Sequence, residues 1–137
     1  MGQYWKPVNL DKREFIHPYK LDSGLKLWEI LVNNHVGRAL CILCAAMPEA
    51  RGGGDLDENP TIGRWAGDRI VLIGDYAEDS DLPPQYNASK IYEECCDGIY
   101  TDITDDVCKV LENELGGKFI THEDGYTEWK DDKKRHR

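Results

Sequence analysis

Arg69-Ile-Val-Leu-Ile-Gly74 carries the strongest β-strand signal in this sequence, and the fold class rests on it. From Ile70 to Ile73, β-branched and aliphatic side chains follow one another without a polar residue, and the run ends at a glycine. This pattern is typical of a strand that is buried on both faces. We therefore expect such a strand at residues 69–73, with the other elements packed around it.

An N-terminal hairpin is the next element that the sequence predicts. Residues 4–10 and 15–19 are short extended runs, and the first has apolar side chains on one parity. Asp11-Lys12-Arg13, which lies between them, is typical of a hairpin loop.

Two helices are expected between this hairpin and the strand. The first begins near Leu25, and its apolar face includes Trp28, which we expect in the core. The second is predicted at about residues 38–47; it is apolar on nearly every side, as a central helix is, and Pro48 ends it. The apolar face of the first helix consists of Leu27, Trp28, Leu31 and Val32.

A further helix and a closing hairpin are predicted after the strand. Thr104 is expected to cap the helix, which ends at Gly116. Residues 118–122 and 126–129 flank Asp124-Gly125, a pair favoured by type I′ hairpin turns.

These elements predict an α+β fold. We expect a single domain at residues 1–130, with a mixed or antiparallel sheet of about five strands and helices mainly on one face. Residues 131–137 are expected to form a basic, disordered tail. The chain of 137 residues is long enough for one core. Its longest apolar run, residues 39–47, is too short to cross a membrane.

The charge of the chain disfavours some classes of partner. Seventeen Lys and Arg residues against 26 Asp and Glu give a formal net charge of −9, which opposes direct binding to nucleic acids or anionic membranes. The segment from Asp75 to Asp106 holds ten acidic residues and one lysine, so this acidic stretch carries the whole excess. It is either a solvated surface or a surface complementary to a basic partner.

A glycine-rich loop at residues 49–68 holds most of the candidate binding residues. Consecutive glycines allow backbone N–H groups to approach a ligand closely. Trp65 is a contact anchor if it is exposed, or the pin of the loop if it is buried. The glycine spacing fits neither common nucleotide-binding motif. The candidate surface consists of Arg51, Gly52, Gly53, Gly54, Asp55, Arg64, Trp65, Asp68, Asp75, Tyr76 and His17.

Aspartates of this region leave a metal-dependent alternative open. Carboxylates are hard oxygen ligands suited to Mg²⁺ or Mn²⁺. Arg51 and Arg64 are able to hold a phosphate, and His17 is a candidate general acid or base. The same arginines are equally able to pair with loop aspartates and fasten the loop. We expect no cofactor outside this alternative, whose candidate metal ligands are Asp55, Asp68 and Asp75.

The cysteines indicate a reduced, cytoplasmic setting, because there are five of them and no signal segment precedes them. Cys41 and Cys44 have the Cys-x-x-Cys spacing of a metal or redox pair. They lie within a predicted apolar helix, however, and we expect them to pack in the core.

Several segments carry a resemblance to other sequences: Gly2-Gln-Tyr-Trp5 with Val8-Asn-Leu-Asp-Lys-Arg-Glu14, Arg51-Gly-Gly-Gly-Asp55, and Trp65-Ala-Gly-Asp-Arg-Ile-Val71 with Gly74-Asp-Tyr76. Over roughly residues 2–115 the chain resembles a group of short uncharacterised proteins from microbial sources. This resemblance implies no catalytic role. It implies that the N-terminal hairpin and the glycine-rich loop form one assembled feature.

We interpret the sequence as that of a non-catalytic binding protein. It is expected to act as an inhibitor or adaptor of a protein with a basic surface, through the glycine-rich loop and the acidic stretch. One alternative is a small metal-dependent phosphoester or nucleotide hydrolase, or a nucleotide-binding protein, that uses the loop aspartates. A second alternative is a structural subunit of a homo-oligomer. No membrane partner is expected, and the sequence leaves the oligomeric state open.

Overall fold

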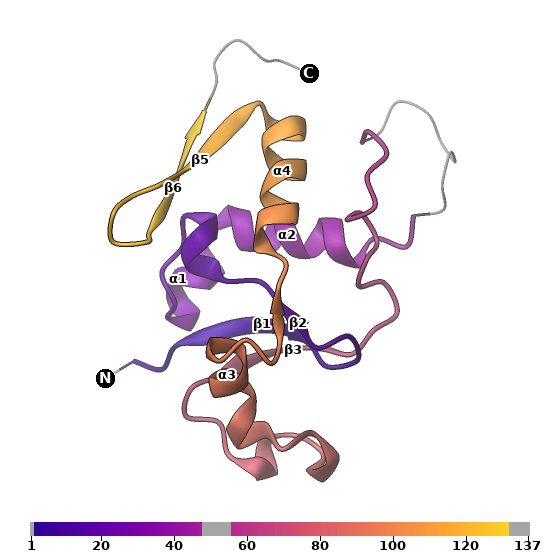
Figure 1. Ribbon diagram of the computed structural model, residues 1–137, viewed down its shortest axis with the longest axis vertical. Coiled ribbons are helices and arrows are strands. Elements are labelled where there is room, and N and C mark those ends of the chain that lie inside the picture. The colour runs from indigo at the N-terminus through magenta and orange to yellow at the C-terminus, as the bar shows by residue number, and fades with distance from the viewer. Residues whose placement is uncertain (1, 48–55, 132–137) are drawn as a thin grey trace.

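The computed structural model describes residues 2–47 and 56–131 (Figure 1). Of the predicted basic tail at residues 131–137, Asp131 is the last residue of a strand, and residues 132–137 lie outside the described residues, as does Pro48. The strands are β1 (Trp5–Asn9), β2 (Glu14–Phe15), β3 (Ile70–Gly74), β4 (Thr101–Asp102), β5 (Gly117–Thr121) and β6 (Thr127–Asp131). The α-helices are α1 (Leu27–Val32), α2 (Asn34–Cys44), α3 (Ala88–Cys96) and α4 (Thr104–Leu115), and the 3₁₀ helices are η1 (Pro18–Leu21), η2 (Asp79–Asp81) and η3 (Pro84–Tyr86).

The predicted α+β class and mixed sheet are confirmed. The main sheet has the strand order β3-β1-β2-β4; β1 pairs antiparallel with β2 and β3, and β2 pairs parallel with β4. The closing hairpin, β5 and β6, forms a separate two-stranded sheet. The strands are therefore divided between a four-stranded and a two-stranded sheet instead of lying in one sheet of about five.

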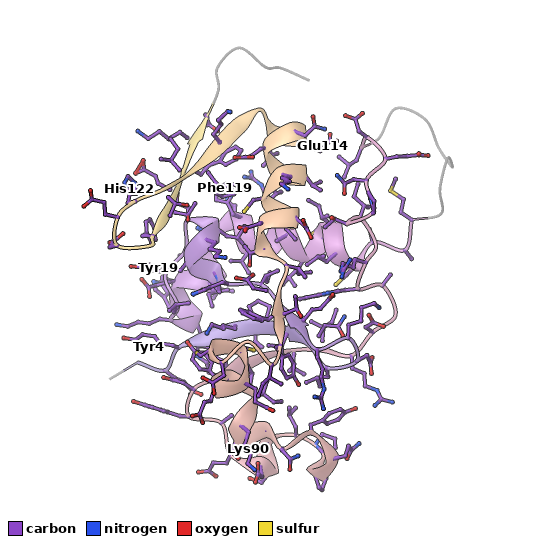
Figure 2. The ribbon with its side chains drawn as sticks, in the orientation of Figure 1. Tyr4, Tyr19, Lys90, Glu114, Phe119 and His122 are labelled. Atoms are coloured by element: carbon purple, nitrogen blue, oxygen red, sulfur yellow. The ribbon has the colours of Figure 1, made fainter. Side chains whose placement is uncertain are left out.

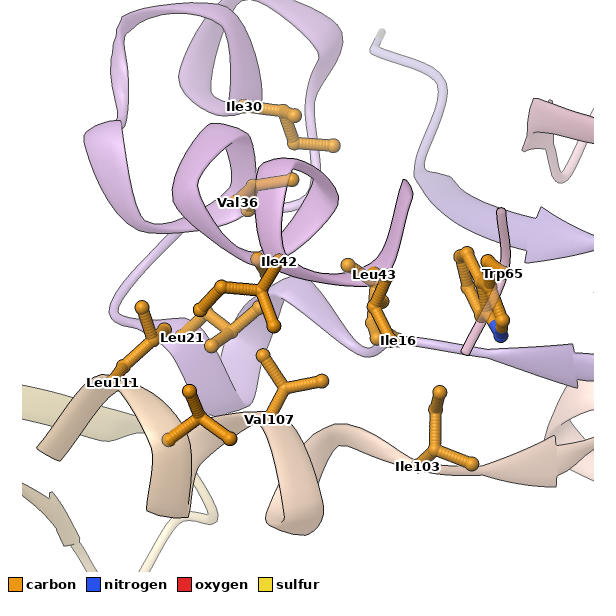
Figure 3. Close-up of a cluster of buried hydrophobic side chains, with 12 residues drawn as sticks. Ile16, Leu21, Ile30, Val36, Ile42, Leu43, Trp65, Ile103, Val107 and Leu111 are labelled. Carbon is orange, nitrogen blue, oxygen red and sulfur yellow. The ribbon is translucent and has the colours of Figure 1, made fainter. Parts of the chain in front are cut away.

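Helices cover the main sheet unequally, as predicted. In Figure 1, α1, α2 and α4 lie on one side of the sheet and α3 lies on the other. The larger core cluster joins α2 and α4 through residues such as Leu43 and Val107 (Figure 3). The smaller cluster packs Ile91 of α3 against Val8 and Phe15 of the sheet. Because side chains alternate along a strand, β1 contributes Trp5 to one cluster and Val8 to the other.

The central strand predicted at residues 69–73 proves to be an edge strand. Among the described strands, β3 pairs only with β1, and Leu72 remains exposed. The prediction of burial on both faces was wrong, because an unbroken apolar run does not reveal how many strands or helices will cover it. Val71 and Ile73 still pack against the α3 side, which explains part of the run.

The first helix begins at Leu27, slightly later than predicted, and presents its apolar face to solvent. Asn33 has an extended backbone, and its side chain accepts hydrogen bonds from His35 N and Val36 N, so the chain stops α1 and starts α2 there. Ile30 is the buried residue of α1. Trp28, which the sequence predicted in the core, is 70% exposed.

The last two elements form as predicted, with different local details. Helix α4 ends at Gly116 in the left-handed conformation, but its N-cap is Ile103, and Thr104 is the first helical residue. Within the turn of the closing hairpin, Gly125 has a positive φ of 88° and Asp124 does not, so the turn is not the type I′ that the residue pair favours.

Candidate functional site

Trp65 is the pin of the glycine-rich loop and not an exposed anchor. Its side chain is fully buried at the end of the larger core cluster (Figure 3), and its indole N–H donates to Glu14 Oε1 at 2.9 Å. Arg64 Nε donates to both carboxylate oxygens of Glu14, at 3.0 and 3.1 Å, and its Nη2 forms an ion pair with Oε2. The outward-facing alternative for Trp65 is wrong: its indole is buried and donates a hydrogen bond to the buried carboxylate of Glu14 on β2.

The loop is also fastened to the tip of the N-terminal hairpin. Asn9 Nδ2 donates to Asp68 Oδ2 at 2.8 Å, and Lys12 forms an ion pair with the same carboxylate. These contacts hold the pKa of Asp68 below its ordinary value. Arg69 N donates to Asp11 Oδ2 at 2.7 Å. The hairpin and the described part of the loop therefore form one assembled feature, as the resemblance implied.

Asp68 and Asp75, the two candidate metal ligands that the structure describes, are not brought together. Asp68 precedes β3 and Asp75 follows it, so an extended strand of about 20 Å separates them. Asp75 Oδ1 instead accepts a hydrogen bond from Tyr4 N at 2.9 Å. Within residues 2–47 and 56–131, no group of three or more His, Cys, Asp or Glu side chains is arranged to hold a metal ion. The third candidate metal ligand, Asp55, lies outside the described residues, as do the binding-surface candidates Arg51, Gly52, Gly53 and Gly54.

His17 lies away from the loop, beside a cavity of about 510 Å³ on the α3 side of the sheet. Burial and the nearby charge of Lys6 lower the pKa of His17 to about 4. The cavity is also lined by Lys6, Cys96 and Asp102. Lys6 was missed by the sequence interpretation, although its parity with Val8 in a half-buried strand indicates that it points inward.

An exposed apolar surface, which we call the apolar edge, lies over α1 and the start of β1. Trp28 and Leu31 are 70% and 73% exposed. Tyr4 pairs with Lys26 in an isolated bridge, and Tyr4, Lys26 and Tyr76 line a hollow of about 320 Å³. Figure 2 shows Tyr4 on the side of the molecule where α1 lies. The exposed residues of the apolar edge are Tyr4, Leu27, Trp28, Leu31, Val32 and Tyr76.

The acidic stretch begins beside the apolar edge. Asp75 N donates to Tyr4 O at 2.9 Å, and Tyr76 N donates to Gln3 Oε1 at 3.3 Å, so the N-terminal strand and the start of the stretch are joined. Lys90 lies on α3 at the opposite end of the molecule from the closing hairpin (Figure 2). Most acidic side chains of the stretch are exposed: Asp75, Glu78, Asp79, Asp81, Glu93, Asp97, Asp105 and Asp106.

Comparison with known proteins gives no match to this chain, whether among protein-family models, curated proteins or solved structures. None of the helices that the structure describes has the length and apolar character that a membrane crossing requires.

Proposed function

We propose that this chain is a non-catalytic binding protein that contacts a partner with a basic surface through the apolar edge and the adjoining acidic stretch. The observation that carries the proposal is the exposure of Trp28 and Leu31 on one face of α1, next to a segment with a formal charge of −9 between Asp75 and Asp106. This surface replaces Trp65 and the glycine-rich loop as the centre of the proposed contact.

The apolar edge has the composition of a binding hot spot. Tryptophan and tyrosine are enriched among the residues that contribute most to protein–protein affinity, and contiguous apolar patches mark interaction sites. Trp28 and Leu31 are separated by one helical turn, so a partner is able to cover both side chains at once. Tyr4 and Tyr76 extend the patch across the start of β1.

The acidic stretch supplies electrostatic attraction around this patch. Glu78 and Asp81 are exposed on the segment that follows Tyr76, and Glu93 and Asp97 are exposed at the end of α3. Charges at the rim of an interface accelerate association and select partners of the opposite sign. Because exposed charges are screened by salt, the proposed complex weakens as ionic strength rises.

The test is affinity capture from the native host with the full chain at about 50 mM and about 500 mM salt. We expect a protein with a basic surface to be retained at low salt and largely lost at high salt. The variant Trp28→Ser/Leu31→Ser should lose it at both salt concentrations, and Glu78→Gln/Glu93→Gln should weaken retention. Ile120→Ser is the matched control, since it removes an exposed apolar side chain of β5 outside the apolar edge.

Self-association through the same face is the competing outcome. An exposed apolar helix face is also suited to a second copy of the chain, as in a homo-oligomer. Light scattering separates the two cases: a stable dimer that Trp28→Ser/Leu31→Ser converts to a monomer would overturn the hetero-partner proposal. A monomer that retains no basic protein at low salt would overturn it as well.

A further inference from the structure

Lys6 is a buried cation without a carboxylate partner. Its side chain is 4% exposed, and its ammonium nitrogen lies 4.0 Å from the ring centroid of Tyr92 and 5.7 Å from that of Phe15. It forms no ion pair within the described residues. A buried charge is costly unless it is paired, so the group that the ammonium does contact is informative.

That group is the sulfur of Cys96. Lys6 Nζ donates to Cys96 Sγ at 3.3 Å, across 90 positions of sequence. Cys96 is exposed and lines the cavity of about 510 Å³ that also holds His17 and Cys95. A thiolate accepts a hydrogen bond from an ammonium group more strongly than a thiol does, and the thiolate is the nucleophilic form of cysteine.

Acidic groups also lie near Cys96, but in a different environment from that of Lys6. Cys96 ends α3, where the helix dipole is negative, and Glu93 and Asp97 are exposed close to it in sequence. Those carboxylates are exposed, and water reduces the effect of an exposed charge. The Lys6 ammonium, in contrast, is buried and donates directly to the sulfur.

The other cysteines provide an internal comparison. Burial raises the pKa of Cys95 and of Cys108 to about 12, which makes these thiols inert. The expectation that Cys41 and Cys44 pack in the core was wrong, because both are exposed; partial burial still raises the pKa of the Cys44 thiol. Among the described cysteines, Cys96 alone receives a hydrogen bond from a cation.

We propose that Cys96 is a reactive thiol at which small neutral peroxides oxidise this protein, with Lys6 as the residue that stabilises negative charge on the sulfur. The surrounding carboxylates repel anionic reagents such as oxidised glutathione, whereas hydrogen peroxide is uncharged. This site does not depend on the proposed partner.

The reaction is a two-electron oxidation. The Cys96 thiol releases its proton to water, and the thiolate attacks one oxygen of hydrogen peroxide. A sulfur–oxygen bond forms as the oxygen–oxygen bond breaks, and the departing hydroxide takes up a proton to become water. The products are a sulfenic acid on Cys96 and one water molecule; sulfur is oxidised and the peroxide is reduced.

The test compares the cysteines of the full, reduced chain at one near-neutral pH. Iodoacetamide, a neutral alkylating reagent, measures thiolate reactivity, and dimedone traps sulfenic acid after addition of hydrogen peroxide. Peptide mass spectrometry assigns each product to its cysteine. We expect Cys96 to be alkylated by iodoacetamide, and to be labelled by dimedone after peroxide addition, about ten times faster than Cys41.

The Lys6→Met variant keeps the length of the side chain and removes the charge. It should lower the rate at Cys96 to about that of Cys41. Lys90→Met removes an exposed charge from α3, the helix that carries Cys96, and should leave the rate unchanged. An unchanged Cys96 rate in a folded Lys6→Met chain overturns the proposal. If Lys6→Met fails to fold, Cys95 and Cys108 will also become labelled, and the wild-type ranking then decides: equal rates at Cys96 and Cys41 overturn the proposal.

Discussion

The indole nitrogen of Trp65 donates a hydrogen bond to Glu14 Oε1 at 2.9 Å, across 51 positions of sequence. Arg64, the preceding residue, completes the coordination of the same carboxylate. Two consecutive loop residues thus converge on one buried acidic side chain of β2. Glu14 is therefore one of the points at which the loop between α2 and β3 is attached to the main sheet.

The first prediction is that Glu14→Gln destabilises the protein in a pH-dependent way. Burial raises the pKa of Glu14, but the hydrogen bonds from Arg64 and Trp65 outweigh it and hold that pKa below the ordinary value of 4.5. The substitution weakens the contact with Arg64, and we expect a loss of about 2 kcal/mol in the free energy of unfolding at neutral pH. Urea denaturation measures it.

The sign of the pH dependence provides the control. Because the pKa of Glu14 is lower in the folded chain, its contribution to stability is present above pH 4.5 and is lost as the pH falls through the folded value. The difference between wild type and Glu14→Gln should therefore shrink below pH 4.5. Glu123→Gln, in the exposed turn of the closing hairpin, should change little; a difference for Glu14→Gln that is constant with pH would contradict the prediction.

Two glycines of the same loop give a second, paired prediction. Gly63 and Gly67 both have a φ of 82°, but a Cβ on Gly63 would lie 2.7 Å from the backbone oxygen of Ala45, whereas a Cβ on Gly67 meets nothing within 4 Å. Gly67→Ala should cost about 1 kcal/mol for the left-handed backbone alone. Gly63→Ala should cost at least about 2 kcal/mol, because the backbone must also move. Equal losses in denaturation would contradict the steric argument.

Local signals were sufficient to predict the elements whose causes lie within the element. Gly116 ends α4, and the residues around Gly125 turn the closing hairpin, because these backbone preferences act over a few positions. Burial was harder to predict. Trp28 was expected in the core and is exposed. For Trp65 the sequence left exposure and burial open; it is buried, and nothing in the spacing around it points to its hydrogen-bond partner Glu14.

The candidate site was predicted only in those parts that do not depend on which elements pack together. The sequence identified the acidic stretch, because charge is visible without a fold, and the attachment of the hairpin to the loop followed from the resemblance. It did not identify the contact between Lys6 and Cys96, which requires β1 and α3 to be packed together. It also grouped Asp68 with Asp75, because proximity in sequence conceals the length of the strand between them.

The third prediction concerns the acid sensitivity that His17 confers. Its ordinary pKa is 6.5, and burial together with the charge of Lys6 lowers it to about 4 in the folded chain. Between these values the unfolded chain binds more protons than the folded chain, so His17 reduces stability as the pH falls from 6.5 to 4. His17→Asn should flatten the pH dependence of the urea midpoint in this window.

Asparagine is chosen because His17 caps η1, where its side chain accepts a hydrogen bond from Tyr19 N, and an asparagine oxygen is able to take that place. The control is His122→Asn, in the exposed turn of the closing hairpin, which should retain the wild-type pH dependence. Since Asp102 and Lys20 also act on His17, the same profile should be recorded at raised salt. A wild-type slope in His17→Asn would show that another group causes the acid sensitivity.

The fourth prediction is that Asp22 holds the closing hairpin on the domain. Asp22 has a positive φ of 54°; its carboxylate accepts a hydrogen bond from Trp129 N at 3.1 Å and another from the Tyr126 hydroxyl. Asp22→Ala removes both acceptors and places alanine in a left-handed backbone, so we expect a loss of about 2–3 kcal/mol. Asp22→Asn keeps the backbone preference and one acceptor oxygen, and it should cost about half as much.

Hydrogen exchange then separates a local from a global effect. In Asp22→Ala, the amides of β5 and β6 should exchange faster relative to the amides that pair β1 with β3. The reason is that no described strand pairs the hairpin sheet with the main sheet. Equal acceleration in both sheets would mean that the hairpin unfolds only with the rest of the domain.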